Sequence, residues 1–235
     1  MTEEKPPLIT IITVVYNGEA TLKDTIESVI SINYKNINYI IIDGGSKDGT
    51  VDVIKNYASY IKYWVSERDK GIYDAMNKGW KMADKNSYIL FLGTGDRVLS
   101  LPQNLKDDYS KVFYGDVVIG NKLFKPTHNK LRLTLGNTLH HQALLIPKTL
   151  NEEPPFGIGY KIYGDFDFNQ RLLKEKVKFE YRKDFKSYAL PGGISADKLN
   201  DEMLGIVKKN FGIVATVIAF CYYSLQKFKQ HLQKL

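Results

Sequence analysis

This sequence alternates between short apolar runs and segments with helical spacing over residues 8–96, and that alternation restricts the fold more than any other feature. Continuous β-branched and aliphatic runs indicate strands covered on both faces, as in a parallel sheet; they occupy residues 8–15, 39–42, 61–65 and 88–92. Apolar residues at helical spacing follow the first three runs, from Thr21, from Val51 and up to about Met82. This order predicts an α/β fold with a doubly wound, mostly parallel sheet, in which ligands bind at the carboxyl ends of the strands.

The second half of the chain carries a weaker pattern. Residues 113–120 and 142–146 predict strands of a small second half-sheet, Asp165 begins a further helix, and residues 203–235 predict a long C-terminal helical region. The 235 residues, 43% of them hydrophobic, suffice for one compact domain with a small appendage. The single cysteine, Cys221, excludes an intramolecular disulfide and a cysteine-based zinc cluster, and MTEEKPPLIT lacks the apolar core of a signal peptide. We therefore expect a cytoplasmic protein.

The net charge of +7 favours a polyanionic or phosphorylated partner, such as a nucleotide, a lipid pyrophosphate, a nucleic acid or an acidic membrane. A nucleic-acid partner is not expected, because no basic-aromatic motif of a known binding module occurs. No acidic residue follows Glu202, whereas lysines stand at positions 208, 209, 227, 229 and 234. Residues 210–226 carry no charge but fall short of the ~20 residues of a membrane span. Two interpretations stay open: a basic helix on the anionic inner leaflet, or a helix docked on the protein core or on a second subunit of a homo-oligomer.

Polar clusters follow the predicted strands at their carboxyl ends, so four turns are expected to converge on one crevice. One of them, residues 43–50 (DGGSKDGT), fits two interpretations. It can be a strand-to-helix turn, or a nucleotide site in which Asp43 accepts a base N–H and the glycines permit close approach. No Gly-x-Gly-x-x-Gly opens the first helix and no Gly-x-x-x-x-Gly-Lys loop occurs, so the usual phosphate cradles of dinucleotide and P-loop proteins are excluded.

The order TVVYN, DGGSKDGT, SERDKGIYDAMNKG and FLGTGD, followed by a later acidic turn, resembles the family 2 glycosyltransferases with the GT-A fold. Within that family it resembles in particular the short bacterial enzymes of exopolysaccharide and O-antigen assembly. The resemblance covers roughly residues 8–195. It implies a catalytic domain over residues 1–200, with a nucleotide-sugar half at about 8–100 and an acceptor half at about 101–200. Residues 201–235 would then be a basic and apolar tail.

On the donor side, the resemblance implies that Thr13, Tyr16 and Asn17 line the nucleotide pocket and that Asp43 contacts uracil or ribose. The segment SERDKGIYDAMNKG would fold around the nucleotide. Further donor-binding residues implied by the resemblance are Asp69, Gly71, Asp74, Asn77 and Gly95. Helical spacing puts Asp74 and Asn77 on neighbouring turns of one face, which supports a shared polar role.

Two further aspartates are candidates for the chemistry. Asp96 follows a buried strand, where it fits either a turn-initiating residue or a ligand of a hard divalent cation whose shell is completed by phosphates and water. The resemblance implies Mn²⁺ or Mg²⁺ there, although the first acid of the family's Asp-x-Asp motif is replaced by Thr94. Asp165 matches the family's general base, which removes the proton of the acceptor hydroxyl. Without the resemblance, an N-terminal cap of its helix is the more frequent explanation of such an Asp.

Other residues near the predicted crevice receive no single role. His141, in the run His140-His141-Gln142, fits metal, diphosphate or acceptor contact or plain hydrogen bonding, and Asp167 is a further candidate for metal, diphosphate or acceptor contact. Arg171 fits a phosphate contact or an ion pair on a helix surface. Residues 190–195 resemble a glycine-rich loop that closes the active site in these short enzymes.

The resemblance implies an inverting glycosyltransferase that moves a sugar from a nucleotide diphosphate donor, expected to be UDP-linked, to a hydroxyl of a saccharide. The acceptor is expected to be carried on a polyprenyl pyrophosphate at the cytoplasmic membrane face, which the protein would reach peripherally through its tail. Two alternatives stay open. One is a sugar nucleotidylyltransferase, although the glycine-rich, basic signature usual after its first strand is missing at residues 16–20. The other is a catalytically inactive nucleotide-sugar-binding subunit, which the incomplete metal motif favours.

Overall fold

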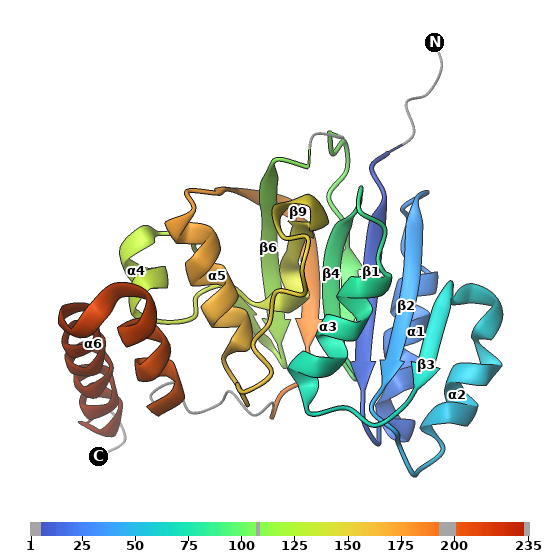
Figure 1. Cartoon of the computed structure of the whole chain (residues 1–235), viewed down its shortest axis with the longest axis horizontal. Coiled ribbons are helices and arrows are strands. Elements are labelled where there is room, and N and C mark those ends of the chain that lie inside the picture. Colours follow the sequence, from blue (N-terminus) through green and yellow to red (C-terminus); the bar gives the residue numbers. More distant parts are fainter. Residues whose placement is uncertain (1–5, 107–108, 193–200, 233–235) are drawn as a thin grey trace.

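The computed structural model describes residues 6–106, 109–192 and 201–232, and within them one nine-stranded sheet carries helices on both of its faces (Figure 1). The sheet order is β3-β2-β1-β4-β8-β6-β9-β5, with β7 paired to β6. The strands are β1 (Ile9–Val15), β2 (Ile37–Asp43), β3 (Tyr63–Ser66), β4 (Tyr88–Gly93), β5 (Arg97–Ser100), β6 (Lys111–Ile119), β7 (Lys122–Phe124), β8 (Leu144–Pro147) and β9 (Lys178–Ala189).

The predicted parallel sheet is confirmed in the N-terminal half. Strand β1 pairs in parallel with β2 and with β4, and β2 pairs in parallel with β3. Ile9, the first residue of β1, is opposite Ile37 and Tyr88, so the three central strands begin in register. Their carboxyl ends therefore meet at one edge of the sheet, which lies at the bottom of Figure 1.

The second half-sheet is continuous with the first, because β8 pairs antiparallel with both β4 and β6. The sequence did not indicate β9, which pairs in parallel with β6 and antiparallel with β5. Strand β9 contains many charged residues and is half-exposed along its first part, so it lacks the continuous apolar run of the central strands.

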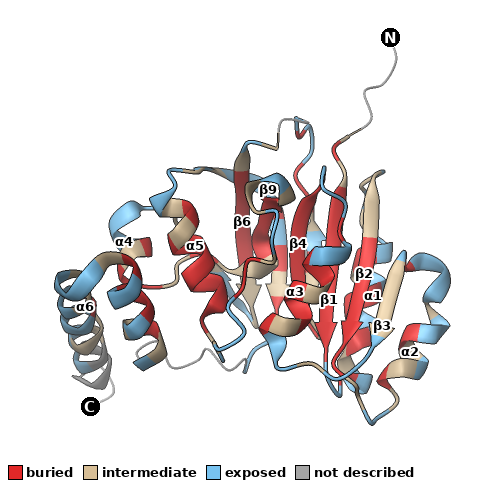
Figure 2. Ribbon diagram, in the orientation of Figure 1, coloured by how far each residue is buried: buried red, intermediate tan, exposed pale blue. Residues whose placement is uncertain are grey.

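Alternate residues of each central strand enter two separate cores, one on each face of the sheet. Ile12 and Val14 of β1 belong to the core that includes helices α3, α4, α5 and α6, whereas Ile9 and Ile11 belong to the core that includes α1 and α2. Figure 2 shows the buried strands between these two layers. The helices are α1 (Glu19–Ile30), α2 (Thr50–Asn56), α3 (Ile72–Met82), α4 (Lys130–Leu135), α5 (Gly164–Lys174) and α6 (Asp201–Leu232), with short 3-10 turns at Ala58–Tyr60, His141–Ala143 and Lys148–Leu150.

Helix α3 lies directly on the sheet because Gly79 has no side chain at the contact. A Cβ atom at Gly79 would overlap the Ile12 side chain of β1. The helix also buries Tyr73, Met76 and Trp80. This close seating places the N-terminal end of α3 beside the carboxyl ends of β1 and β4, where the candidate site lies.

Helix α6 bends at Gly212, whose φ of 82° lies in the left-handed region. Before the bend, Ile206 and Val207 are buried against the body of the protein. After the bend, Ala219 is buried and Tyr223 contacts Gly136 beside α4. The predicted C-terminal helical region is therefore confirmed, but it forms two segments that both pack on the protein.

Candidate active site

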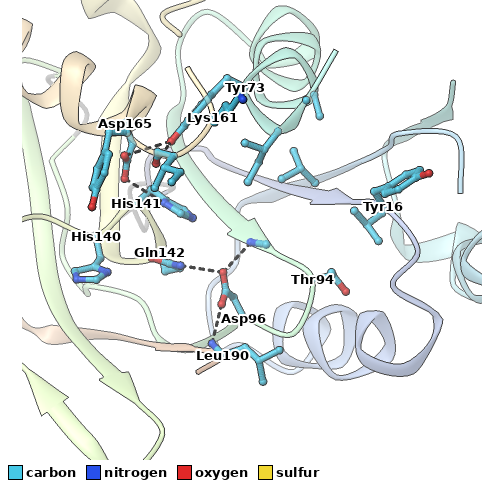
Figure 3. A pocket seen from close by; sticks show the side chains of 18 of the residues that line it. Tyr16, Tyr73, Thr94, Asp96, His140, His141, Gln142, Lys161, Asp165 and Leu190 are labelled. Carbon is cyan, nitrogen blue, oxygen red and sulfur yellow. Dashed lines mark hydrogen bonds and ion pairs between the residues drawn. The ribbon is translucent and has the colours of Figure 1, made fainter. Parts of the chain in front are cut away.

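A cavity of about 570 Å³ opens at the carboxyl ends of β1 and β4, between the start of α3 and the start of α5 (Figure 3). Its wall comes from six separate parts of the chain, which the fold brings together at one edge of the sheet. Leu190, Pro191 and Gly192 border the cavity, and its polar lining residues are Tyr16, Asp69, Tyr73, Thr94, Asp96, Asn137, His140, His141, Gln142, Lys161, Tyr163 and Asp165.

Asp96 lies in the turn after β4 and is 6% exposed. Its Oδ2 accepts hydrogen bonds from the Gly93 backbone N–H at 2.9 Å and from Gln142 Nε2 at 3.1 Å. Its Oδ1 accepts from the backbone N–H of Leu190 at 2.9 Å. The carboxylate therefore ties the end of β4 to the segments after α4 and β9, and it faces the cavity with a fixed orientation.

Asp165 lies in the first turn of α5 and is 8% exposed. Its Oδ1 accepts the Phe166 backbone N–H at 2.8 Å, and its Oδ2 accepts from Asn137 Nδ2 at 3.2 Å. The Tyr73 hydroxyl donates to the carbonyl of Ile162 at 2.6 Å and stands 3.4 Å from Asp165 Oδ1. Burial, and then the charge of Asp165, raise the pKa of Tyr73, so its hydroxyl stays protonated at neutral pH.

His141 and Gln142 lie between the two aspartates, as Figure 3 shows. His141 Nδ1 is 3.4 Å from Asp165 Oδ2, while the next residue, Gln142, bonds Asp96. Burial lowers the pKa of His141, but the hydrogen bond to Asp165 and the charges of Asp165 and Asp96 together raise it above its usual value. The dipeptide His141-Gln142 thus contacts both carboxylates, and its imidazole places a proton donor next to Asp165.

The donor set at Asp96 fits a hard divalent cation. Oxygen ligands suit Mg²⁺ and Mn²⁺, and Gln142 Oε1, an amide oxygen of the residue bonded to Asp96, is buried without a hydrogen-bond partner among the described residues. No group of three or more His, Cys, Asp or Glu side chains capable of holding a metal occurs in the described part of the chain. A cation here would therefore take most of its ligands from a bound diphosphate and water.

Among the predicted donor residues, Tyr16, Asp69 and Gly71 line the cavity. Tyr16 is 59% exposed at its mouth. Asp69 Oδ1 accepts the Gly71 backbone N–H at 2.9 Å, and the positive φ of Gly71, 121°, lets the chain turn into α3. Tyr16 follows β1, and Asp69 and Gly71 lie between β3 and α3.

The side chains of Thr13 and Asp43 do not reach this cavity. Thr13 is fully buried in the sheet, where its hydroxyl lies 3.0 Å from the Tyr39 hydroxyl. Asp43 is also fully buried and accepts from the backbone N–H of Ser46 at 3.0 Å and from the hydroxyls of Ser46 and Ser66. In this structure both side chains organise the strand ends rather than the cavity surface.

Four other predicted donor residues also lie outside the cavity lining. Asn17 has a positive φ of 49° and accepts the Lys47 backbone N–H at 3.0 Å. The N–H of Gly95 donates to Thr25 Oγ1 at 2.8 Å. The remaining two are on α3. Asp74 accepts the Lys70 backbone N–H, and Asn77 bonds both backbone groups of Phe156, at 2.7 Å and 3.0 Å.

Asp167 points away from Asp165 on the other side of α5. It is 2% exposed and accepts from Lys209 Nζ and Asn210 Nδ2, each at 3.0 Å, and from Arg171 Nε at 3.3 Å. Of the two interpretations of Arg171, the ion pair is therefore present. This cluster borders a second hollow rather than the main cavity.

Several cavity residues were not identified from the sequence. Tyr73 fits a core position by spacing, and it is buried, but its hydroxyl reaches Asp165. Asn137 and Lys161 lie in irregular segments without a local pattern. Gln142 had a usable signal, since it is a polar residue between a histidine and a buried strand. The predicted loop of residues 190–195 contributes Leu190–Gly192, while 193–195 lie outside the described residues.

Known proteins share both the sequence pattern and the fold. The family described as Glycosyl transferase family 2 matches residues 10–98. Over 213 residues the chain is 27% identical to a PGL/p-HBAD biosynthesis glycosyltransferase of Mycobacterium bovis, an alignment that covers 84% of this chain and 83% of that protein.

Two solved structures show the same fold. The S. aureus TarS 1-349 structure in complex with UDP-GlcNAc has a TM-score of 0.62 at 15% identity, over 85% of this chain and 64% of that one. Mannosyltransferase PcManGT from Pyrobaculum calidifontis, in complex with GDP-Man and Mn²⁺, has a TM-score of 0.57 at 14% identity, over 78% of this chain and 57% of that one. This chain thus spans less than two thirds of either solved structure.

Proposed function

The chain belongs to the family 2 glycosyltransferases with the GT-A fold, and from this premise we propose that it is an inverting enzyme that transfers a sugar from a UDP-sugar to a hydroxyl of a lipid-linked saccharide. Such a step belongs to the assembly of a bacterial surface polysaccharide, for example an O-antigen or an exopolysaccharide. Residues 1–200 would form the catalytic domain, with donor and acceptor halves that meet at the cavity, and residues 201–235 the attachment region.

The observation that carries the proposal is the placement of two buried carboxylates on either side of His141 and Gln142 in one cavity. Asp165 lies beside the acceptor half of the sheet and Asp96 at the end of β4 in the donor half. Tyr16, Asp69 and Gly71 form the rest of the donor wall. A donor is supported further by the fold relatives, one solved with UDP-GlcNAc and another with GDP-Man.

In the proposed reaction, the acceptor hydroxyl oxygen attacks the anomeric carbon while the bond from that carbon to the diphosphate oxygen breaks. Asp165 takes the hydroxyl proton, and the electron pair of the broken bond leaves with UDP. The Phe166 N–H and the Asn137 amide hold the Asp165 carboxylate in place. His141 keeps a proton donor beside it. This arrangement requires no covalent intermediate with the enzyme.

A bound Mn²⁺ or Mg²⁺ would supply positive charge to the departing diphosphate. Asp96 would hold it, together with the free amide oxygen of Gln142. Lys161 also lines the cavity and adds a positive charge of the protein's own. Asp165 and Asp96 thus have different tasks, one on the nucleophile and the other on the leaving group.

The acceptor is proposed to reach the site from a membrane surface. Residues Asp201–Gln226 are, among the described residues, the one helical stretch long and apolar enough by length and composition to cross a membrane. The first half of α6 packs on the protein, and after Gly212 the uncharged part is only residues 213–226, about 21 Å at 1.5 Å per residue. This length is shorter than the ~30 Å hydrocarbon layer, so the segment is proposed to lie on the inner leaflet.

The exposed side of this segment is apolar over most of its length. Ala215, Ala219 and Tyr223 face the protein at intervals of four residues. The opposite side exposes large apolar side chains, with fractions from 40% to 71%: Ile213, Val214, Val217, Ile218, Phe220, Tyr222 and Leu225. Lysines 208 and 209 before it and 227 and 229 after it in the sequence suit an anionic lipid surface.

The test of the catalytic proposal is Asp165→Asn, measured as acceptor-dependent release of UDP. We expect kcat to fall by about 10²–10⁴-fold, because an amide cannot accept the proton. Asp116→Asn is the matched control: Asp116 is a buried aspartate that bonds the Tyr181 hydroxyl outside the cavity lining, and its substitution should leave kcat within a few-fold. Equal kcat for wild type and Asp165→Asn would refute the assignment of the base.

The membrane proposal is tested by sedimentation with vesicles. Wild-type protein should bind vesicles that contain phosphatidylglycerol, and Val217→Glu with Phe220→Glu should abolish binding because it places charges on the lipid-facing side. A pair of substitutions on the exposed surface of α1, Lys23→Glu and Glu27→Lys, serves as the control and should leave binding intact. If the α6 variant changes the mass of the protein in solution without changing vesicle binding, the exposed face is a subunit interface instead.

A further inference from the structure

A second hollow lies on the far side of α5 from Asp165. It is an open groove of about 630 Å³ between the start of α5, the first half of α6 and the loop before α5. The main cavity has no lining residue in common with it. The groove is lined by Pro154, Pro155, Phe156, Gly157, Gly159, Tyr160, Asp167, Arg171 and Lys209.

Two cationic side chains of the groove form ion pairs with one buried carboxylate. Arg171 and Lys209 both pair with Asp167, so these three side chains carry one net positive charge, two minus one. Asp167 is 3% exposed in its side chain, whereas Arg171 is 29% and Lys209 55% exposed. The negative charge is therefore covered while the positive groups face the groove, which makes the open surface attractive to an anion.

Hydrogen bonds hold both cationic side chains in position, and each side chain keeps N–H donors for a ligand. Arg171 donates from Nε to Asp167 and from one terminal nitrogen to the Pro155 carbonyl. Lys209 donates to Asp167 and to the Tyr160 hydroxyl, each at 3.0 Å. A guanidinium has five N–H donors and an ammonium three, so neither group is exhausted by these bonds. Fixed Arg and Lys donors are the usual recognition elements for phosphate groups.

The groove and the main cavity are separated by one stretch of chain. Tyr160 lines the groove, and the next residue, Lys161, lines the cavity. Asp165 and Asp167 show the same division, because two residues along a helix point about 200° apart. A ligand that lies across residues 157–163 can thus place one end beside Asp165 and the other beside Arg171 and Lys209.

The groove also adjoins the apolar part of α6. Lys209 lies three residues before the bend at Gly212, and the exposed apolar side chains begin with Ile213. Figure 1 shows α5 beside α6 at this end of the molecule. A cationic groove next to an exposed apolar helix matches the chemistry of a lipid that carries a phosphate head group.

We propose that Arg171, Lys209 and Tyr160 form a subsite for the diphosphate of a lipid-linked acceptor, with the sugar of that acceptor at Asp165 and its hydrocarbon chain along α6. This inference rests on the proposed function and adds a binding site for the acceptor diphosphate that is separate from the donor diphosphate at Asp96. Asp167 positions both cations and moderates their charge.

The experiment measures equilibrium binding of farnesyl diphosphate and of inorganic pyrophosphate by calorimetry, with UDP and Mg²⁺ saturating the main cavity. Both probes should bind the wild-type protein. Arg171→Gln and Lys209→Gln should each weaken both probes by about tenfold, because each removes a charge-assisted hydrogen bond. Lys55→Gln, which removes an equal charge from an exposed pair on α2, should change neither affinity.

Asp167→Asn should change the affinity for both probes in the opposite direction. It keeps a side-chain oxygen for Lys209 and Asn210 but removes the negative charge, so both probes should bind about fivefold more tightly. A purely structural role of the cluster would give weaker binding or none after this substitution. The sign of the change therefore separates an anion site from a packing contact.

Three results would overturn the proposal: no binding of either probe, binding that the Arg171 and Lys209 substitutions leave unchanged, or binding of pyrophosphate with exclusion of farnesyl diphosphate. The last result would show a site for a free anion rather than for a lipid. A separate titration of the protein with UDP and Mg²⁺ alone distinguishes failure of this proposal from failure of the proposed function. If UDP binds and farnesyl diphosphate does not, only the subsite is wrong; if UDP does not bind, the transferase itself is in question.

Discussion

Substitution of Asn77 distinguishes a nucleotide contact from a structural hydrogen bond. Its amide donates to the Phe156 carbonyl at 2.7 Å, and its carbonyl accepts the Phe156 N–H at 3.0 Å; both residues are buried. Asn77→Ala removes both bonds and leaves two buried backbone groups without these partners, each at a cost of about 1–3 kcal/mol. We therefore expect a loss of about 3 kcal/mol in the free energy of unfolding, or about 6–12 °C in Tm for a chain of this size.

Urea unfolding and UDP binding measure the two roles of Asn77 separately. The structure predicts a lower urea midpoint for Asn77→Ala, with the affinity for UDP within about threefold of wild type while the protein is folded. Asn38→Ala is the matched control, since Asn38 bonds Asp84 on the exposed surface and its loss should cost less than about 1 kcal/mol. A large loss of UDP affinity at unchanged stability would refute this reasoning and support the nucleotide contact.

Three more substitutions test other parts of the structure. The pKa of His141 is raised in the folded state, so its protonated form stabilises the fold below about pH 6.5. This contribution is lost as the pH rises through the folded-state pKa. Urea midpoints measured at several pH values should therefore show this decline in wild type and not in His141→Gln. Glu202 accepts the backbone N–H groups of Lys161, Ile162 and Tyr163, so Glu202→Ala should loosen this cavity segment and raise the KM for acceptor several-fold, with UDP affinity unchanged in direct titrations. Gly79→Val should lower the free energy of unfolding by about 1–3 kcal/mol in thermal melts, because α3 cannot move away from Ile12 without losing its packing.

The N-terminal half of the fold was predictable because its strands are buried on both faces. Continuous apolar runs such as residues 8–15 are typical of strands inside a parallel sheet, and the helices between them show clear spacing. Strand β9 escaped prediction because part of it is exposed and it carries four lysines and arginines. The bend at Gly212 is a backbone property that hydrophobic spacing does not reveal.

The position of the site was predictable, but the direction of individual side chains was not. Tyr16 and Thr13 both come at the end of one strand, yet Tyr16 lies at the cavity and Thr13 points into the core beside Tyr39. Alternation along a strand decides this, and the sequence alone does not say which face bears the ligand. Asn137 and Lys161 enter the cavity through tertiary contacts of irregular segments, for which no periodic signal exists.

Asp165 and Asp167 are two residues apart on α5 but face different sites. Both are buried acids in the first turn of α5, and the sequence offers both as site residues. The structure separates them: Asp165 faces the cavity with Asn137 and His141, and Asp167 anchors the cations of the second groove. Only the partners of each carboxylate, not its position at a helix start, distinguish the proposed base from the residue that pairs with Arg171 and Lys209.

The most direct test of the proposed sugar transfer is nucleotide release from a panel of sugar nucleotides with a membrane-lipid extract as acceptor, in Mn²⁺, Mg²⁺ or EDTA. We expect release of UDP together with incorporation of the sugar into lipid, and both rates should fall by about 10²–10⁴-fold in Asp165→Asn. Release of pyrophosphate from a nucleoside triphosphate would indicate a nucleotidylyltransferase instead. Binding of nucleotide without release under every condition would rule out the proposed transfer and indicate a non-catalytic binding subunit.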